Sequence, residues 1–400
     1  MNFADAFTPT QLGPLRLRNR FIKTATYEGM CPDSMPSDDL VEHHRRIAAG
    51  GVAMTTVAYA SVSPNGRTFP EQLTMRPEVV PALRRVVEAI HAEGAAASLQ
   101  LGHCGYFSKN TELPGRTSLG PSRLFNAYGV FKGMFFSRAM SHAELDEVVE
   151  DFGRAAALAL DAGFDALELH LGHGYLLSQF LSPWSNRRSD DYGGSLSNRL
   201  RLPLRVLARV REAVGSTPIL AKINVNDGFA GGLEETEAVE IAAALDQAGI
   251  DAIVTSGGFT SKSPLYLMRG ERPLRDMIEV EKSTAQRLAL LAFGPAVIRA
   301  WPFEENFFQA AGEQIRARVS CPVALLGGIS SRAGVERAMQ AGFPLLVVGR
   351  ALIHDPDFVH KLQSGAIERS GCTHCNRCIA EMDRPGGVRC ALPDAPGARR

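Results

Sequence analysis

The sequence lacks an excess of charge of either sign. It contains 43 Lys and Arg residues and 43 Asp and Glu residues, so its formal net charge is zero. Bulk charge therefore gives no support to a nucleic-acid partner or to binding at an anionic membrane. The sequence also lacks an apolar run of about 18 residues, which argues against a membrane span. Its first residues lack the basic and then apolar pattern of a secretion signal.

Cysteine is scarce and unevenly distributed. Of the seven cysteines, Cys31, Cys104 and Cys321 are scattered, and four cluster near the C-terminus. An odd number with one tight cluster is not the pattern of a secreted disulfide framework. It indicates a reducing compartment, for which we expect the cytoplasm, and it suggests a metal site in the cluster.

Eight short runs rich in apolar and β-branched residues recur along the chain and predict strands. They cover residues 21–26, 52–60, 96–101, 166–171, 219–225, 252–256, 322–326 and 345–348. Several are apolar throughout, as is typical of parallel strands that are buried on both faces. Amphipathic segments of helical period lie between them, for example at 77–92, 143–162, 234–248 and 304–319.

The alternation of strand and helix predicts a parallel sheet with helical crossovers. Eight such units favour a closed (β/α)8 TIM barrel. The alternative is an open, doubly wound sheet, which would carry a G-x-G-x-x-G turn after its first strand, whereas TATYEGM stands there. We expect the α/β barrel to cover residues 1–363 and a Cys-, Gly- and Pro-rich extension to cover 364–400.

Polar residues and glycines collect at the ends of the predicted strands. They are Gln100, His103, His170, His173, Tyr175, Lys222, Asn224, Ser256, Gly257, Gly258, Gly327, Gly328, Gly349 and Arg350. The long connections 103–142, 173–200 and 259–303 also follow strands. In a barrel, the ends of the parallel strands meet at one mouth, where active sites lie. We therefore expect these residues to meet.

Some of these residues predict binding of a charged ligand. The ends of strands seven and eight form the usual phosphate site of such barrels. Gly328 and Gly349 expose backbone N–H groups there, and Arg350 adds positive charge; alternatively, the glycines only turn the chain. Lys222 interrupts an apolar strand, which is costly unless the lysine meets an anion or reaches solvent at the strand tip. Gln100 binds a ligand or satisfies a buried carbonyl.

His170, His173 and Tyr175 form a candidate reaction centre. Two imidazoles can donate hydrogen bonds to one oxyanion, and a tyrosine can donate a proton. The alternatives are a core histidine with a helix-capping one, or a zinc site, for which the H-x-x-H spacing alone is a weak signal.

The segment HLGHGYLLSQFLSPWSNRRSDDYGGSLSNRLRL, which starts at His170, resembles the hallmark block of the old yellow enzyme family of NADH:flavin oxidoreductases. LRNR, SLQLGH, AKINVND, GGIS and VVGRALIHDPDF follow the family order, so the resemblance covers most of the chain. It implies an FMN-binding TIM barrel in which hydride passes from NADH or NADPH through flavin N5 to an activated alkene. A flavin-dependent demethylase or dehydrogenase, and an FMN and iron–sulfur electron-transfer subunit, are the alternatives.

The resemblance also implies individual roles. Ala25 and Thr26 would lie against the flavin, and Tyr27 occupies the position near its C4 carbonyl, where relatives often have Cys, Thr or His. Gln100 would bind the edge of the isoalloxazine ring, and Lys222, which is Arg in many relatives, would face the N1 and C2 carbonyl region.

The phosphate and substrate sites follow in the same way. The residues that match the FMN phosphate site are Gly328, Gly349 and Arg350. His170 and His173 match the pair that binds the substrate carbonyl oxygen, and Tyr175 matches the donor of a proton to the α-carbon.

The cysteine cluster has the spacing C-x2-C-x2-C-x11-C, formed by Cys372, Cys375, Cys378 and Cys390. This spacing suits an iron–sulfur cluster or zinc, and free thiols are the remaining alternative. The pattern resembles the [4Fe-4S] motif of two larger relatives, 2,4-dienoyl-CoA reductase and trimethylamine dehydrogenase. Beyond a small-molecule substrate, the candidate partners are a separate reductase and further copies of the chain.

Overall fold

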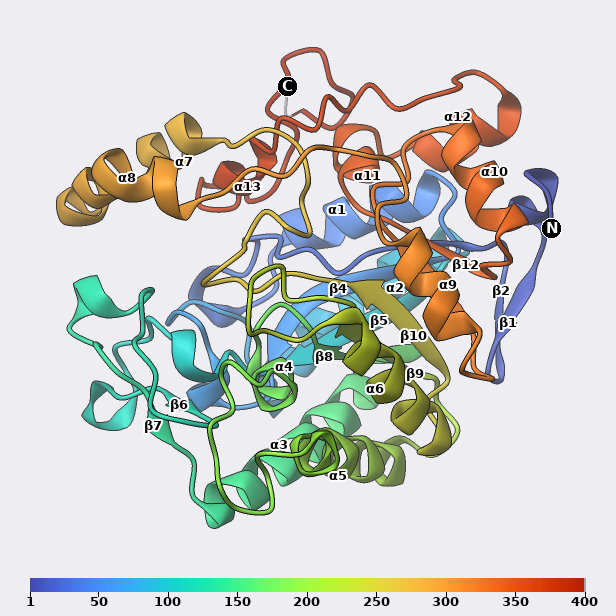
Figure 1. Ribbon diagram of the computed structural model, residues 1–400. Helices are drawn as coiled ribbons and strands as arrows, with labels where there is room; N and C mark the ends of the chain where they lie inside the picture. The colour runs from blue at the N-terminus through green and yellow to red at the C-terminus, as the bar shows by residue number, and fades with distance from the viewer. Residues whose placement is uncertain (399–400) are drawn as a thin grey trace.

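The predicted (β/α)8 barrel is confirmed by the computed structural model, which describes residues 1–398 (Figure 1). Eight parallel strands close in the order β10-β11-β12-β3-β4-β5-β8-β9. Their bounds are β3 Phe21–Lys23, β4 Met54–Ser61, β5 Ala96–Gly102, β8 Ala166–Leu171, β9 Ile219–Asn224, β10 Ala252–Ser256, β11 Val323–Leu326 and β12 Leu345–Val348. All eight predicted strands are present, and β8, β10 and β12 have the predicted bounds.

The barrel interior explains why these runs form strands. Every residue of the eight strands is buried except Ala96, which is half-buried at the start of β5. Their side chains therefore pack inward on each other and outward under the helices. A hairpin of β1 (Thr10–Leu12) and β2 (Leu15–Leu17) adds Leu12 and Leu17 to the interior cluster, and the sequence analysis did not predict it.

Ten helices of the described chain surround or follow the strands. They are α1 Asp38–Ala49, α2 Val80–Ala92, α3 His142–Asp161, α4 Leu176–Leu181, α5 Leu196–Val214, α6 Glu235–Gln247, α9 Gln309–Arg316, α10 Arg332–Gln340, α11 Arg350–His354 and α12 Phe358–Ser364. The predicted helices 143–162 and 234–248 match α3 and α6 within one residue. The predicted helix 304–319 is shorter, because 305–308 form a turn in which Asn306 has a φ of 63°.

Two of the long connections contain elements that the sequence analysis did not predict. The connection 103–142 contains the short strands β6 (Leu119–Gly120) and β7 (Arg138–Ala139). The connection 259–303 contains α7 (Leu274–Val280) and α8 (Thr284–Val297), which extend away from the barrel in Figure 1. Within residues 1–398, no helix has both the length and the hydropathy that crossing a membrane requires.

The C-terminal segment after α12 lies against the barrel (Figure 1). Its helix α13 (Cys378–Glu381) contacts α7. The backbone N–H of Val388 donates to the carbonyl of Glu28, at 2.6 Å, in the loop that follows β3. The predicted boundary at residue 364 falls on the last residue of α12, and the cysteine cluster lies beyond it.

Candidate active site

Three buried polar side chains are linked across β5, β8 and β9. Lys222 Nζ donates to Glu168 Oε1 at 2.8 Å, and Gln100 Nε2 donates to the same oxygen at 2.8 Å. Strand register brings them together, since Gln100 pairs with Glu168. Lys222 also donates to Thr24 Oγ1 at 3.0 Å. The anion that the sequence analysis required for Lys222 is thus Glu168, which it did not single out.

The sequence contains a feature from which Glu168 could have been predicted. It is a charged residue inside the buried run ALELHL, as Lys222 is inside LAKINV. Two opposite charges in neighbouring buried strands are expected to pair, because an isolated buried charge is strongly unfavourable.

The loop after β3 places the three residues predicted to lie along the flavin at the same mouth. Ala25 and Tyr27 contact a cluster of aromatic side chains, and the Tyr27 ring lies 5.7 Å from that of Tyr59. Thr26 Oγ1 donates to the Thr24 carbonyl at 3.5 Å. Burial raises the pKa of the Tyr27 phenol, so Tyr27 is neutral near pH 7.

His170, His173 and Tyr175 come together as predicted. The His170 ring centroid lies 4.8 Å from that of His173 and 4.2 Å from that of Tyr175. His170 is the last residue but one of the buried strand β8, whereas His173 lies in the following turn with a φ of 58°. The His173 N–H donates to Asn224 Oδ1 at 2.9 Å, and its Nε2 lies 2.6 Å from Ser256 Oγ.

Burial sets the protonation of these three groups. It lowers the pKa of His173 to about 3 and that of His170 well below its usual value, and the positive charge of Lys222 acts in the same direction. Burial and the neighbouring Tyr59 raise the pKa of Tyr175 well above its usual value. At neutral pH the site therefore holds two neutral imidazoles and a protonated phenol.

Among His170, His173 and Tyr175, one ring nitrogen lacks a hydrogen-bond partner within the described chain. His170 Nδ1 is buried and has no hydrogen-bond partner in the described chain. Buried polar atoms are nearly always hydrogen-bonded, so a nitrogen left without a partner indicates a place for a ligand atom.

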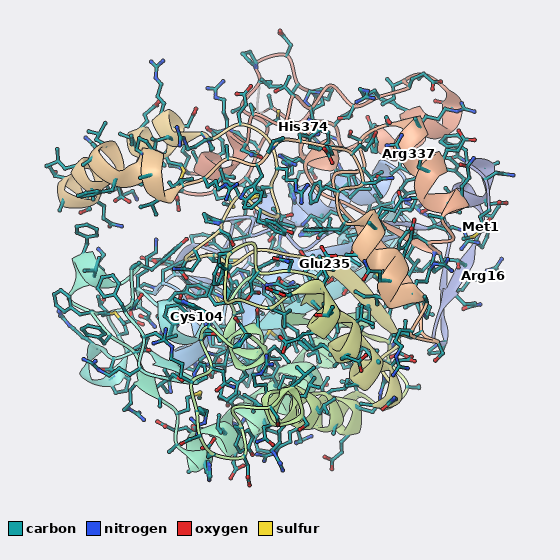
Figure 2. All side chains as sticks on the ribbon, viewed as in Figure 1. Met1, Arg16, Cys104, Glu235, Arg337 and His374 are labelled. Atoms are coloured by element: carbon teal, nitrogen blue, oxygen red, sulfur yellow. The ribbon has the colours of Figure 1, made fainter. Side chains whose placement is uncertain are left out.

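The mouth is walled by aromatic side chains, which we call the aromatic wall. Its buried members are Tyr59, Tyr106, Phe107, Tyr175 and Phe259, and its half-buried members are Tyr27, Tyr128, Trp184 and Phe229. Cys104 is packed among these rings, and its side-chain label in Figure 2 marks the region. The half-buried rings of this cluster offer a surface that suits the apolar body of a small organic ligand.

His103 was expected at the strand ends, and the structure gives it a local contact. Its Nδ1 accepts a hydrogen bond from the Gly105 N–H at 3.0 Å. Burial lowers its pKa to about 4, so it is neutral at pH 7. Through Nδ1, His103 shapes the turn after β5, while its Nε2, like His170 Nδ1, has no hydrogen-bond partner in the described chain.

The predicted phosphate site brings a cation without a carboxylate partner to the mouth. In the described chain, Arg350 Nη1 donates to the Arg269 carbonyl at 2.8 Å and to Asn376 Oδ1 at 2.5 Å, and no ion pair is formed. Burial lowers the pKa of Arg350, which shows the cost of holding its charge there. Gly349 lies beside Thr24, since a Cβ on it would stand 3.2 Å from Thr24 Cγ2. With Gln100 and Lys222 nearby, these residues fit a flavin with a phosphate.

The four clustered cysteines line one small cavity, together with Arg350, His354 and Asn376. Burial raises the pKa of Cys378 to about 12, and it also raises the pKa values of Cys372 and Cys390. In residues 1–398 no three or more His, Cys, Asp or Glu side chains are arranged to hold a metal ion. The predicted metal site is therefore not shown, although its four residues are neighbours.

The fold and the mouth define an FMN-type oxidoreductase barrel, and comparison with known proteins gives its family. Residues 5–260 match the NADH:flavin oxidoreductase / NADH oxidase family. The chain belongs to this family, which confirms the resemblance to old yellow enzymes and makes the protein an FMN-dependent NAD(P)H oxidoreductase.

Two curated relatives differ in length. The chain is 42% identical over 393 residues to 4,4'-dithiodibutanoate disulfide reductase of Rhodococcus erythropolis, covering 97% of this chain and 95% of that relative. It is 31% identical over 390 residues to a metal reductase of Desulforamulus reducens, covering 96% of this chain and 53% of that protein. The chain thus spans about half the length of the second relative.

Solved structures share the fold. The old yellow enzyme homologue from Zymomonas mobilis aligns with a TM-score of 0.73 and 20% identity, covering 93% of this chain and 96% of the other. Histamine dehydrogenase from Rhizobium sp. 4-9 aligns with a TM-score of 0.79 and 23% identity, covering 97% of this chain and 52% of the other. At these identities the likeness concerns the fold alone.

Proposed function

We propose that the protein reduces the carbon–carbon double bond of α,β-unsaturated carbonyl compounds with NADH or NADPH. The observation that carries this proposal is the contact between His170, His173 and Tyr175 at the mouth. Two neutral imidazoles can donate hydrogen bonds to a carbonyl oxygen, and the phenol beside them retains its proton.

The residues at the strand ends would hold the cofactor. Gln100 and Lys222 would bind the ring, while Arg350, Gly328 and Gly349 would bind the phosphate. When bound, FMN supplies hydride chemistry, taking a hydride from the nicotinamide and returning it to the substrate. Glu168 fixes Lys222 and Gln100 through one oxygen, so both would be oriented before the cofactor arrives.

The side chains around the substrate would activate the alkene. His170 and His173 would bind the carbonyl oxygen and stabilise the negative charge that develops on it, which makes the β-carbon electrophilic. Tyr175 would give its proton to the α-carbon. The aromatic wall would exclude water from the bond that reacts.

Tyr175→Phe tests this assignment. Because the phenol would act only on the alkene, rapid mixing with NADH or NADPH should show nearly unchanged flavin reduction. Alkene reduction with cyclohexenone should slow by about 100-fold or more, as expected for loss of a general acid. Tyr106→Phe, which removes a hydroxyl of the same wall that contacts Ser261, is the matched control. Equal loss in both half-reactions of Tyr175→Phe would contradict the assignment.

A second substrate class is supported by one relative. The disulfide reductase of Rhodococcus erythropolis is 42% identical and matches along nearly its whole length. The same site would then transfer the two electrons of NADH to a disulfide. The S–S bond breaks, and two protons, one of them from solvent, complete the two thiols. Anaerobic NADH oxidation with 4,4'-dithiodibutanoate and with cyclohexenone compares the two classes directly. A higher kcat/KM for the disulfide than for cyclohexenone would show that disulfide reduction, and not alkene reduction, is the main activity.

We also propose that Cys372, Cys375, Cys378 and Cys390 hold a [4Fe-4S] cluster. Support comes from their shared cavity and spacing. Cluster binding would require the thiols to lose their protons and the segment to close around the metal. Anaerobic purification should give about four iron and four sulfide per chain, and Cys378→Ala should remove them. Zinc, or flavin-loaded protein without metal, would contradict the proposal.

A further inference from the structure

We infer that the mouth binds an anionic group of the substrate between Lys262 and Arg187, at the Trp184 end of the aromatic wall. Both cations lie on the Trp184 ring. Lys262 Nζ is 4.9 Å and the Arg187 guanidinium carbon 5.9 Å from its centroid. Lys262 also lies 5.4 Å from the Phe229 centroid. This inference rests on the proposed function, because it names the class of substrate that the His170 and His173 site would receive.

The two cations lack the anionic partners that their neighbours have. In the described chain neither Lys262 nor Arg187 forms an ion pair, and Arg187 Nε donates only to the Trp184 carbonyl, at 3.1 Å. In contrast, the adjacent Arg188 pairs with Asp190 at 2.5 Å. The unpaired positive charge is therefore local to the Trp184 end of the wall.

The carboxylate of Asp227, whose backbone carbonyl accepts from Ser263 beside Lys262, is already engaged. Burial raises the pKa of Asp227, and its carboxylate accepts from Ser182 Oγ at 2.6 Å, Asn224 Nδ2 at 2.7 Å and the Leu233 N–H at 2.9 Å. Both oxygens of Asp227 are hydrogen-bonded within the chain, and no ion pair with Lys262 is formed among the described residues. Lys262 and Arg187 therefore remain available to an anion from outside the chain.

The backbone that carries Lys262 is fixed to the reaction centre. Thr260 donates to the His173 carbonyl through its N–H at 2.9 Å and through Oγ1 at 2.8 Å. On the other side, Ser263 Oγ donates to the Asp227 carbonyl at 2.5 Å. The fold therefore holds the Cα of Lys262 in a fixed relation to His173, although the amine itself is exposed.

A continuous series of rings joins the two ends. Tyr175 contacts Phe107 at a centroid distance of 5.1 Å, Phe107 contacts Tyr106 at 6.0 Å, and Tyr106 contacts Trp184 at 6.2 Å. Phe107 and Tyr106 are buried, but the half-buried rings of Tyr128 and Trp184 contact them. A flat apolar body could lie across these two rings with its carbonyl at the histidines and its anion at Lys262 and Arg187. The substrate class is an aromatic or alicyclic enone or enal that carries a carboxylate.

The alternative is that both cations simply stack on Trp184, as arginine and lysine do on many protein surfaces. The experiment compares cinnamaldehyde with 4-carboxycinnamaldehyde, which differ by one carboxylate. The holoenzyme should show the higher kcat/KM for the carboxylate. In K262Q/R187Q the kcat/KM for 4-carboxycinnamaldehyde, divided by that for cinnamaldehyde, should fall about three- to tenfold, as for the loss of exposed charge pairs. The change should lie in KM.

Arg16→Gln is the matched control, since Arg16 is an exposed cation on β2, away from Cys104 and the mouth (Figure 2). It should leave the ratio unchanged. An unchanged ratio in K262Q/R187Q would overturn the inference. Calorimetric titration of the oxidised holoenzyme with 4-carboxycinnamaldehyde, without nicotinamide, separates the two proposals. Weaker binding in K262Q/R187Q supports the anion site even if no alkene is reduced, and equal binding in both proteins overturns it.

Discussion

The barrel mouth and the cysteine cavity both bury ionisable groups, but only the mouth pairs opposite charges. Lys222, Glu168 and Gln100 meet through one carboxylate oxygen. Strand β5 places Gln100 opposite Glu168, and β9 places Lys222 opposite His170, two residues along β8 from Glu168 and on the same face. The four thiols lie in irregular backbone and on the short α13, and burial raises the pKa values of Cys372, Cys378 and Cys390. Side chains on strands are therefore arranged before any ligand binds, whereas the thiols would be arranged by a metal.

The largest effect should come from breaking the charge pair of the mouth. Lys222→Met leaves Glu168 buried without its cation, which should lower the free energy of unfolding by about 3–5 kcal/mol. Urea denaturation of flavin-free protein measures this. The double variant K222M/E168Q removes both charges and should recover much of the loss. Cys378→Ala in metal-free protein is the comparison, and it should cost less. A loss for Lys222→Met no larger than that for Cys378→Ala would remove the distinction between the two regions.

A second, smaller effect should appear on acidification. His103 has a pKa of about 4 in the fold, whereas an unfolded histidine titrates near about 6.5. The unfolded chain therefore takes up a proton first as the pH falls. The stability contributed by neutral His103 is complete above about pH 6.5 and is lost as the pH falls towards 4.

Between pH 7 and pH 5, His103 alone should account for about 2 kcal/mol of lost unfolding free energy. His103→Gln keeps a polar side chain at the Gly105 N–H and should reduce the acid loss by that amount. Urea denaturation at the two pH values provides the measurement. The same acid loss in both proteins would show that His103 is not held neutral by the fold.

The sequence predicted the mouth better than the tail, for physical reasons. β8 and β10 are short apolar runs bounded by glycine or polar residues, so their bounds could be predicted. Glu168 was missed although it lies in a predicted strand, because its pairing with Lys222 depends on register between strands. Hairpin β1–β2 has only three residues in each strand, too few for a periodic pattern. Apolar α8 was missed within a connection expected to be irregular.

In the tail, spacing predicted which residues meet but not their geometry. The four cysteines do line one cavity, yet the positive φ angles of His374 and Asn376 follow no repetitive pattern that a sequence could reveal. The contact between Asn376 and Arg350 joins two segments that the sequence analysis treated separately, and only the fold shows it.

The smallest effect tests that contact, where the two regions meet. Asn376 is buried between Cys375 and Cys378, and its Nδ2 donates to the carbonyls of Met268 at 2.6 Å and Glu271 at 2.9 Å. Its Oδ1 accepts from Arg350. Asn376→Ala should release the guanidinium from its position and weaken FMN binding about tenfold, or about 1.4 kcal/mol. Titration of flavin-free protein with FMN, followed by flavin fluorescence, measures the Kd.

Asn198→Ala is the matched control, because Asn198 also donates from Nδ2 to a backbone carbonyl, that of Gly193 at 3.0 Å, but does not contact Arg350. It should leave the FMN Kd unchanged. If Asn376→Ala also leaves it unchanged, Arg350 is positioned by the barrel alone and the tail has no part in the phosphate site. If the affinity falls as expected, a residue between two candidate metal ligands helps to build the mouth. Closure of the thiols around a metal would then alter FMN binding through the contact between the Asn376 amide and Arg350.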